Sequence, residues 1–75
     1  MTIHIVYFKH FSDPEISDIK AFEKIEDADK YTLDLAFKWY NRTFTSVIEL
    51  ELWLNTPLES EDIPGRPTVV TTELN

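Results

Sequence analysis

Cysteine is absent from this chain of 75 residues, and glycine occurs only once. Without cysteine the chain has no disulfides, no thiolate metal sites and no cysteine nucleophile. Chains this short usually need a disulfide, a metal ion or a partner chain to be stable. Because 43% of the residues are hydrophobic and 13% are aromatic, a single core is still achievable. The composition therefore predicts one small domain that depends on good packing or on association.

Basic residues are also scarce, since seven Lys and Arg face 14 Asp and Glu for a net charge of -7. The excess is concentrated in residues 44–75, where Arg66 is the only base. Binding to phosphates requires Lys and Arg, so this charge disfavours nucleic acid and anionic membranes as partners. It favours a protein partner with a basic surface, or serves solubility alone.

Long apolar runs are missing as well. No segment approaches the roughly 18 residues that cross a membrane. The first ten residues alternate polar and apolar side chains, unlike the continuous apolar run of a signal peptide. We therefore expect a soluble, cytoplasmic protein.

The first half of the chain predicts a hairpin followed by a helix. Residues 3–9 and 16–22 read as strands, and Ser12-Asp13-Pro14 between them is a turn signal. In the first strand both faces are apolar, which indicates a central strand or one covered on both sides. The only long helix is expected to begin at Lys24 or Ile25 and to continue to Tyr40.

The second half predicts another strand and an extended tail. Residues 44–54 alternate, which predicts a strand whose core side carries Phe44, Ile48, Leu50, Leu52 and Leu54. Ile63-Pro64-Gly65-Arg66 fits a type II turn. Residues 68–72 are β-branched and predict either a short last strand or an arm ordered by a partner.

Together these elements predict an α+β fold of order β-β-α-β. A small antiparallel sheet of three to four strands packs against one helix, and the last strand is the short C-terminal one if it forms. Residues 1–56 would form the sheet-plus-helix core, and residues 57–75 an acidic loop and C-terminal tail of the same domain.

The predicted helix has two apolar sides. One side is expected to pack on the sheet and contains Ala28, Tyr31, Thr32, Leu35, Ala36 and Trp39. The other side, roughly opposite, contains Leu33, Phe37 and Tyr40. A helix that covers a single sheet should be polar there. Either residues 66–72 fold back over this side, or it is a surface for self-association or for a partner.

Catalytic and metal-binding patterns are not found. His4 and His10 lie roughly 20 Å apart along a straight strand and accompany no nucleophile motif, so they read as surface histidines. Glu49 and Glu51 would lie about 7 Å apart on one strand face, a spacing compatible with glycoside hydrolysis. A domain of 75 residues can hardly hold a sugar-binding cleft. We therefore expect a protein that is not an enzyme and has no cofactor or metal.

A partner-binding surface is predicted instead around Trp53. Its neighbours Glu49 and Glu51 give it the composition of an interface anchor with a charged surround, although a buried Trp capping the sheet is an equal alternative. Three further carboxylates of this predicted surface lie in the acidic loop: Glu59, Glu61 and Asp62.

The order strand, strand, helix, strand, with an acidic start and an aromatic end to the helix, resembles small bacteriophage proteins that disable host enzymes. The resemblance spans residues 22–54 and includes the phage inhibitor of host RNA polymerase. A second resemblance is to acidic inhibitors that mimic DNA, for which residues 49–62 would supply the carboxylates. These resemblances imply an inhibitor or modulator that occupies a basic or nucleic-acid-binding surface of a host protein in the host cytoplasm. The alternative is a small homodimeric structural or regulatory module that associates through Leu33, Phe37 and Tyr40 or through the tail.

Overall fold

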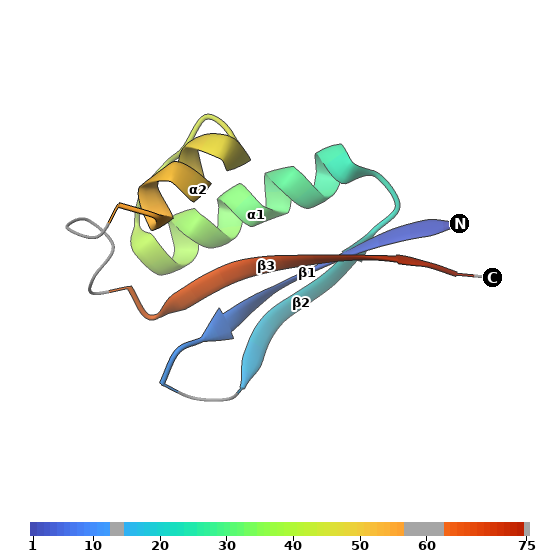
Figure 1. Ribbon diagram of the computed structural model, residues 1–75, viewed down its shortest axis with the longest axis horizontal. Coiled ribbons are helices and arrows are strands. Elements are labelled where there is room, and N and C mark those ends of the chain that lie inside the picture. The colour runs from blue at the N-terminus through green and yellow to red at the C-terminus, as the bar shows by residue number, and fades with distance from the viewer. Residues whose placement is uncertain (13–14, 57–62, 75) are drawn as a thin grey trace.

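A three-stranded antiparallel sheet carries two helices on one of its faces in the computed structural model of the chain (Figure 1). The structure describes residues 1–12, 15–56 and 63–74. The elements follow the order β1 (Thr2–His10), β2 (Ile16–Phe22), α1 (Ile25–Tyr40), α2 (Val47–Leu54) and β3 (Gly65–Glu73). The predicted α+β class, with a small antiparallel sheet against a helix, is confirmed.

Strand β1 lies at the centre of the sheet, and the order across it is β2-β1-β3. The predicted pairing of the first two strands is confirmed, although Asp13 and Pro14 of the predicted turn lie outside the described residues. The β-branched segment near the C-terminus forms β3, which pairs antiparallel with β1 along its whole length, from Thr2 opposite Glu73 to His10 opposite Gly65. The last strand is therefore longer than predicted.

The strand predicted for residues 44–54 is wrong, because Val47–Leu54 form helix α2. Ser46 is its N-cap, and its hydroxyl accepts a hydrogen bond from the Glu49 amide at 3.1 Å. The Glu49 carboxylate in turn accepts from the amide and the hydroxyl of Thr45. This reciprocal arrangement closely follows the capping box of a Ser followed three residues later by a Glu, which satisfies the free amides of a first helical turn.

The core consists of two clusters that share α1. The first lies between α1 and the sheet, where Val6 and Phe8 of β1 are fully buried and the Phe8 ring stacks on Trp39 at 4.7 Å. The second lies between α1 and α2 and contains Ala36, Phe44, Leu50 and Leu54. The predicted sheet-facing side of α1 is confirmed at Ala28 and Leu35, whereas Ala36 packs toward α2.

The second apolar side of α1 is covered mainly by α2. Leu33 and Tyr40 pack against the cluster between the two helices, and Phe37 stays 58% exposed. The C-terminal segment does not fold over this side as a separate arm, because it is paired in the sheet. Tyr40 nevertheless reaches β3, where its hydroxyl donates to the Gly65 carbonyl oxygen at 2.6 Å.

Gly65 starts β3 and is not the left-handed residue of a type II turn, since its φ is not positive. Its role is to permit close approach of two backbones. A Cβ at this position would overlap the Lys9 carbonyl oxygen and lie 2.7 Å from the Phe8 ring. The only glycine of the chain is thus required by packing between β3 and β1.

Candidate functional site

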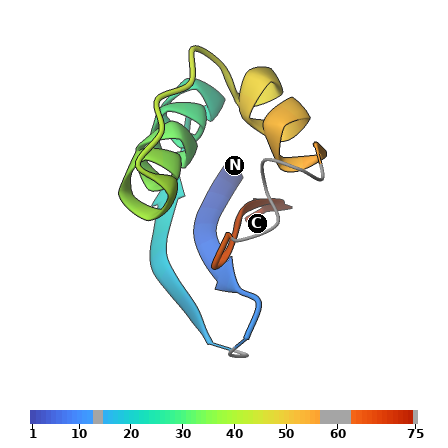
Figure 2. The same cartoon turned by 90° about the vertical axis from the view of Figure 1, so that its left-hand side faces the viewer.

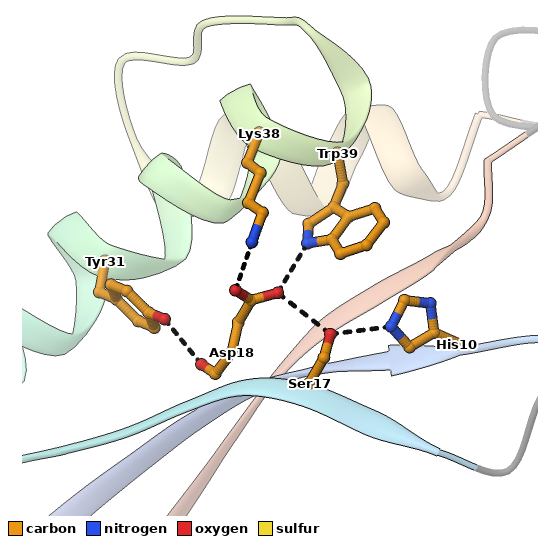
Figure 3. A network of polar contacts seen from close by, with 6 residues as sticks. All are labelled: His10, Ser17, Asp18, Tyr31, Lys38 and Trp39. Atoms are coloured by element: carbon orange, nitrogen blue, oxygen red, sulfur yellow. Dashed lines mark hydrogen bonds and ion pairs between the residues drawn. The ribbon is translucent and has the colours of Figure 1, made fainter.

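A polar network around Asp18 links β2 to α1 (Figure 3). The register between β1 and β2 shifts between Val6 and Phe8, so that Asp18 and Ile19 together lie opposite Tyr7. Asp18 has a φ of 59°, in the left-handed region that Asp and Asn tolerate better than most residues. Such a β-bulge re-aims a side chain, and here it turns the Asp18 carboxylate toward α1.

The Asp18 carboxylate is held by three donors. One oxygen lies 2.5 Å from Lys38 Nζ, and the other accepts from Trp39 Nε1 and from Ser17 Oγ, each at 3.0 Å. The hydrogen bond from Lys38 is the main reason that the pKa of Asp18 is lowered, against the opposing effect of burial. The backbone carbonyl of Asp18 accepts from the Tyr31 hydroxyl at 2.7 Å.

His10, Ser17 and Asp18 are the residue types of a hydrolase triad, but they are hydrogen-bonded in a different order, with Ser17 between the other two. The Ser17 hydroxyl donates to Asp18, and His10 Nε2 lies 2.8 Å from the same hydroxyl oxygen (Figure 3). With the Ser17 hydroxyl donating to the carboxylate, its proton is directed away from His10. In a catalytic triad the histidine instead accepts the proton of the serine. The contacts to Lys38, Trp39 and Tyr31 fasten β2 to α1.

The other side of the sheet carries neither of the two helices that the structure describes. Figures 1 and 2 show both helices on the same face, so the residues of β1 that alternate with Val6 and Phe8 point away from them. These residues are Ile3, Ile5 and Tyr7. On β3, Val70 lies opposite Ile5 and is 43% exposed.

Ile19 of β2 belongs to the same side. Its neighbours Asp18 and Lys20 both face α1, since Asp18 contacts Lys38 and the Lys20 ammonium lies 5.6 Å from the Tyr31 ring centroid. Ile19 therefore points away from the helices, and its side chain is 59% exposed. We call the five residues Ile3, Ile5, Tyr7, Ile19 and Val70 the bare sheet face.

The bare sheet face is unusual for its lack of acidic residues. Within the three strands, the positions on this side contain no Asp or Glu, although the chain has 14 of them. Lys9 lies beyond the bare sheet face at one end, and Thr68 and Thr72 of β3 are the polar residues beside it, opposite Tyr7 and Ile3. Depletion of charge around apolar and aromatic side chains is typical of the centre of a protein–protein interface.

The predicted partner surface around Trp53 is not assembled as expected, because its residues lie on a helix. The Glu49 carboxylate caps α2, and its hydrogen bond from the Thr45 hydroxyl lowers the pKa of Glu49. Glu51 pairs with Arg66 at 3.3 Å. Trp53 is half-buried, with its ring 5.1 Å from that of Tyr40. The predicted residues Glu59, Glu61 and Asp62 lie outside the described residues.

The predicted self-association set is also divided. Leu33 and Tyr40 contact the cluster beneath α2, which leaves Phe37 as its exposed member. Ile48 and Leu52, which sequence analysis assigned to the core, are 74% and 66% exposed on α2. They lie one helical turn apart, so α2 presents an apolar pair to solvent.

Sequence reasoning missed two parts of this arrangement. The Ser46–Glu49 capping box was readable in the sequence and would have identified α2. The Asp18 network had no such signal, because a bulge cannot be read from a seven-residue strand with weak alternation.

Metal-binding and membrane-spanning features are not found in the part of the chain that the structure describes. No three His, Asp or Glu side chains there are grouped to hold a metal ion. No helix among those residues combines the length and apolar character needed to cross a membrane.

Comparison with known proteins finds no similar protein: no family model matches the chain, and neither a curated protein nor a solved structure does.

Proposed function

We propose that this chain is a non-enzymatic binding protein that inhibits or modulates another protein by covering part of its surface. The observation that carries the proposal is the bare sheet face, an apolar surface without acidic residues on the side of the sheet that the helices leave open. Burial of apolar area is the main driving force of protein association. Tyr7 at the middle of β1 supplies the aromatic side chain that interface centres favour.

The chemistry of the partner follows from charge. A net charge of -7 opposes nucleic acid and anionic lipid and attracts a basic protein surface. Because the acidic residues that the structure describes lie outside the bare sheet face, they would increase the rate of association without being desolvated at its centre. The partner surface that fits is therefore an apolar patch with basic residues around it.

The resemblance to phage inhibitors adds little to this proposal. It relied on a strand after α1, and α2 occupies that place. Inhibition of a host enzyme remains one form that the proposed modulation could take, and its support is the acidic charge and the bare sheet face.

Two matched substitutions test the proposal. Ile19→Lys changes the bare sheet face, and Ile48→Lys makes the same change on α2; both replace an exposed isoleucine, 59% and 74% exposed. The immobilised chain and both variants are used to capture proteins from a bacterial lysate, and the captured protein is then purified and titrated. We expect Ile19→Lys to weaken its binding at least tenfold, about 1.4 kcal/mol, and Ile48→Lys to bind like the unmodified chain.

The reverse pattern would place the interface on α2 and reject the bare sheet face. Equal binding by both variants would reject it as well. Circular dichroism of each variant establishes that it is folded before its binding is compared.

A further inference from the structure

The outer edge of β3 is not covered from Val69 to Thr71 by any residue that the structure describes. Which residues of β3 bond to β1 and which face outward is established at the chain ends. There Met1 and Leu74 exchange two backbone hydrogen bonds, at 2.7 and 3.1 Å. Hydrogen-bonded and non-hydrogen-bonded pairs alternate along an antiparallel ladder. Thr72, Val70 and Thr68 consequently bond to β1, and the residues between them point their amides and carbonyls outward.

The outward groups belong to Val69, Thr71 and Glu73. Two further observations agree with this phase. Pro67, which has no amide hydrogen, falls at an outward position, where it removes no bond to β1. The His10 amide donates to the Glu15 carbonyl at 3.4 Å, on the β2 side of β1, as the same alternation requires.

The remaining edges of the sheet are protected. On β2 the bulge and the left-handed Asp18 interrupt the edge, and the Tyr31 hydroxyl occupies the Asp18 carbonyl. At the start of β3 the Tyr40 hydroxyl occupies the outward carbonyl of Gly65. Bulges, charges and covering groups are the usual protection against edge pairing. Among the described residues, nothing of this kind covers the backbone from Val69 to Thr71, and Figure 1 shows this half of β3 running away from α2.

We propose that a second copy of this chain pairs with this edge. Two β3 strands would run antiparallel about a two-fold axis at Val70, so that the two sheets form one continuous sheet with all helices on the same face. In this register Val70 lies opposite Val70 of the second copy, Val69 opposite Thr71, and Thr68 opposite Thr72. Every one of these pairs is β-branched, which suits cross-strand packing. Glu73 lies opposite Pro67, so no like charges meet directly.

The small area of the bare sheet face is a second reason to expect a second copy at the β3 edge. Three strands about 4.8 Å apart, two of them nine residues long and β2 seven, present a face of at most roughly 14 by 30 Å, or about 400 Å². A stable interface uses about 800 Å² on each partner. Pairing through β3 places two such faces side by side and reaches this area. This argument from area rests on the proposed function, whereas the argument from the free backbone groups of β3 does not.

Charge gives the pairing a signature. Two chains of net charge -7 repel each other, and salt screens the repulsion. Self-pairing should therefore tighten as ionic strength rises. Binding to a basic partner should weaken under the same conditions.

Sedimentation equilibrium with two matched variants tests the pairing. Val69→Lys places a charge at the exposed edge of β3, and Ile19→Lys places the same charge on β2. We expect the unmodified chain and Ile19→Lys to approach twice the 8.8 kDa chain mass at high micromolar concentration, more strongly in 0.5 M than in 0.05 M NaCl. Val69→Lys should associate at least tenfold more weakly. A chain that stays at 8.8 kDa at several hundred micromolar in 0.5 M NaCl overturns the proposal.

Amide hydrogen exchange of the unmodified chain provides a test that needs no variant. Pairing should slow exchange at Val69, Thr71 and Glu73 as concentration rises, whereas Val70 and Thr72 are already bonded within the sheet. A dimer in which those three amides keep their monomer rates would use another surface and refute edge pairing. The two proposals fail separately: loss of partner binding in Ile19→Lys with a monomeric chain supports only the bare sheet face, and dimerisation without such a loss supports only the edge.

Discussion

Asp18 combines two properties that few side chains share. Its backbone is left-handed, with φ at 59°, and its carboxylate collects hydrogen bonds from Lys38, Trp39 and Ser17. Asp and Asn are the residues other than glycine that adopt this conformation most readily, and only Asp adds the negative charge that pairs with Lys38. Asp therefore suits position 18 both for its left-handed backbone conformation and for its negative charge.

Substitution of Asp18 by Asn should separate these properties, because Asn keeps the left-handed preference and loses the charge. At pH 7 we expect the variant to be less stable by about 1.5–3 kcal/mol, the range of hydrogen bonds to charged groups, as measured by urea denaturation. The pKa of Asp18 is lowered from its ordinary value of 3.8. The charged form is thus favoured by folding, and its stabilisation is complete above pH 3.8 and disappears as pH falls through the lower native pKa.

The difference in unfolding free energy between the parent and Asp18→Asn should consequently shrink between pH 5 and pH 2. Asp34→Asn, on the exposed side of α1, is the control and should show a small difference at every pH. A difference for Asp18→Asn that stays constant down to pH 2 would contradict the charged network.

Helix α2 shows where reading a pattern by its period fails. In residues 44–54 nearly every second side chain is apolar, which fits a strand. The same segment also places Leu50 and Leu54 four residues apart, where a helix packs them on one side, and they are buried against Ala36. The spacing of the apolar residues alone therefore does not distinguish a strand from a helix in this segment. The Ser46 cap and the strong helix preference of Leu and Glu favour the helix.

Removal of the cap should measure its contribution. Ser46→Ala leaves the Glu49 amide without its acceptor, so we expect a loss of about 1 kcal/mol in the free energy of unfolding. Ser46→Asp, which retains a good cap, should recover most of it. Thr43→Ala, at an exposed position before the helix, serves as the control. If Ser46→Ala is as stable as the parent in urea denaturation, packing on α1 holds α2 without help from the cap.

Strands β1 and β2 and helix α1 were predictable because β1 and α1 have clear patterns and because β2 follows β1 closely enough in the chain to pair with it as a hairpin. Both faces of β1 were recognised as apolar, but which face the helices would cover depends on the position of β3, more than 50 residues away in the chain. The bare sheet face could not be identified for this reason. The predicted site near Trp53 assumed a strand, and its residues lie on helix α2 instead.

The apolar residues that the structure describes are buried in two small core clusters, and others are exposed on the bare sheet face and on the helices. Domains of this size bury little surface alone, so association would contribute a large share of their stability. If β3 pairs with a second copy, unfolding must also separate the chains. The melting temperature should then rise with chain concentration.

Above the dissociation constant, a tenfold increase in concentration should add about 0.7 kcal/mol to the stability of each chain, because the concentration of free monomer rises only as the square root of the total. For a domain of this size, that corresponds to about 3–6 °C in melting temperature. Thermal unfolding followed by circular dichroism at 5, 50 and 500 μM measures the effect, and the melting temperature of Val69→Lys should rise less than that of the parent over this range. A parent chain whose melting temperature is constant over this range has no native self-association, because any complex formed only by the folded state must stabilise it by mass action.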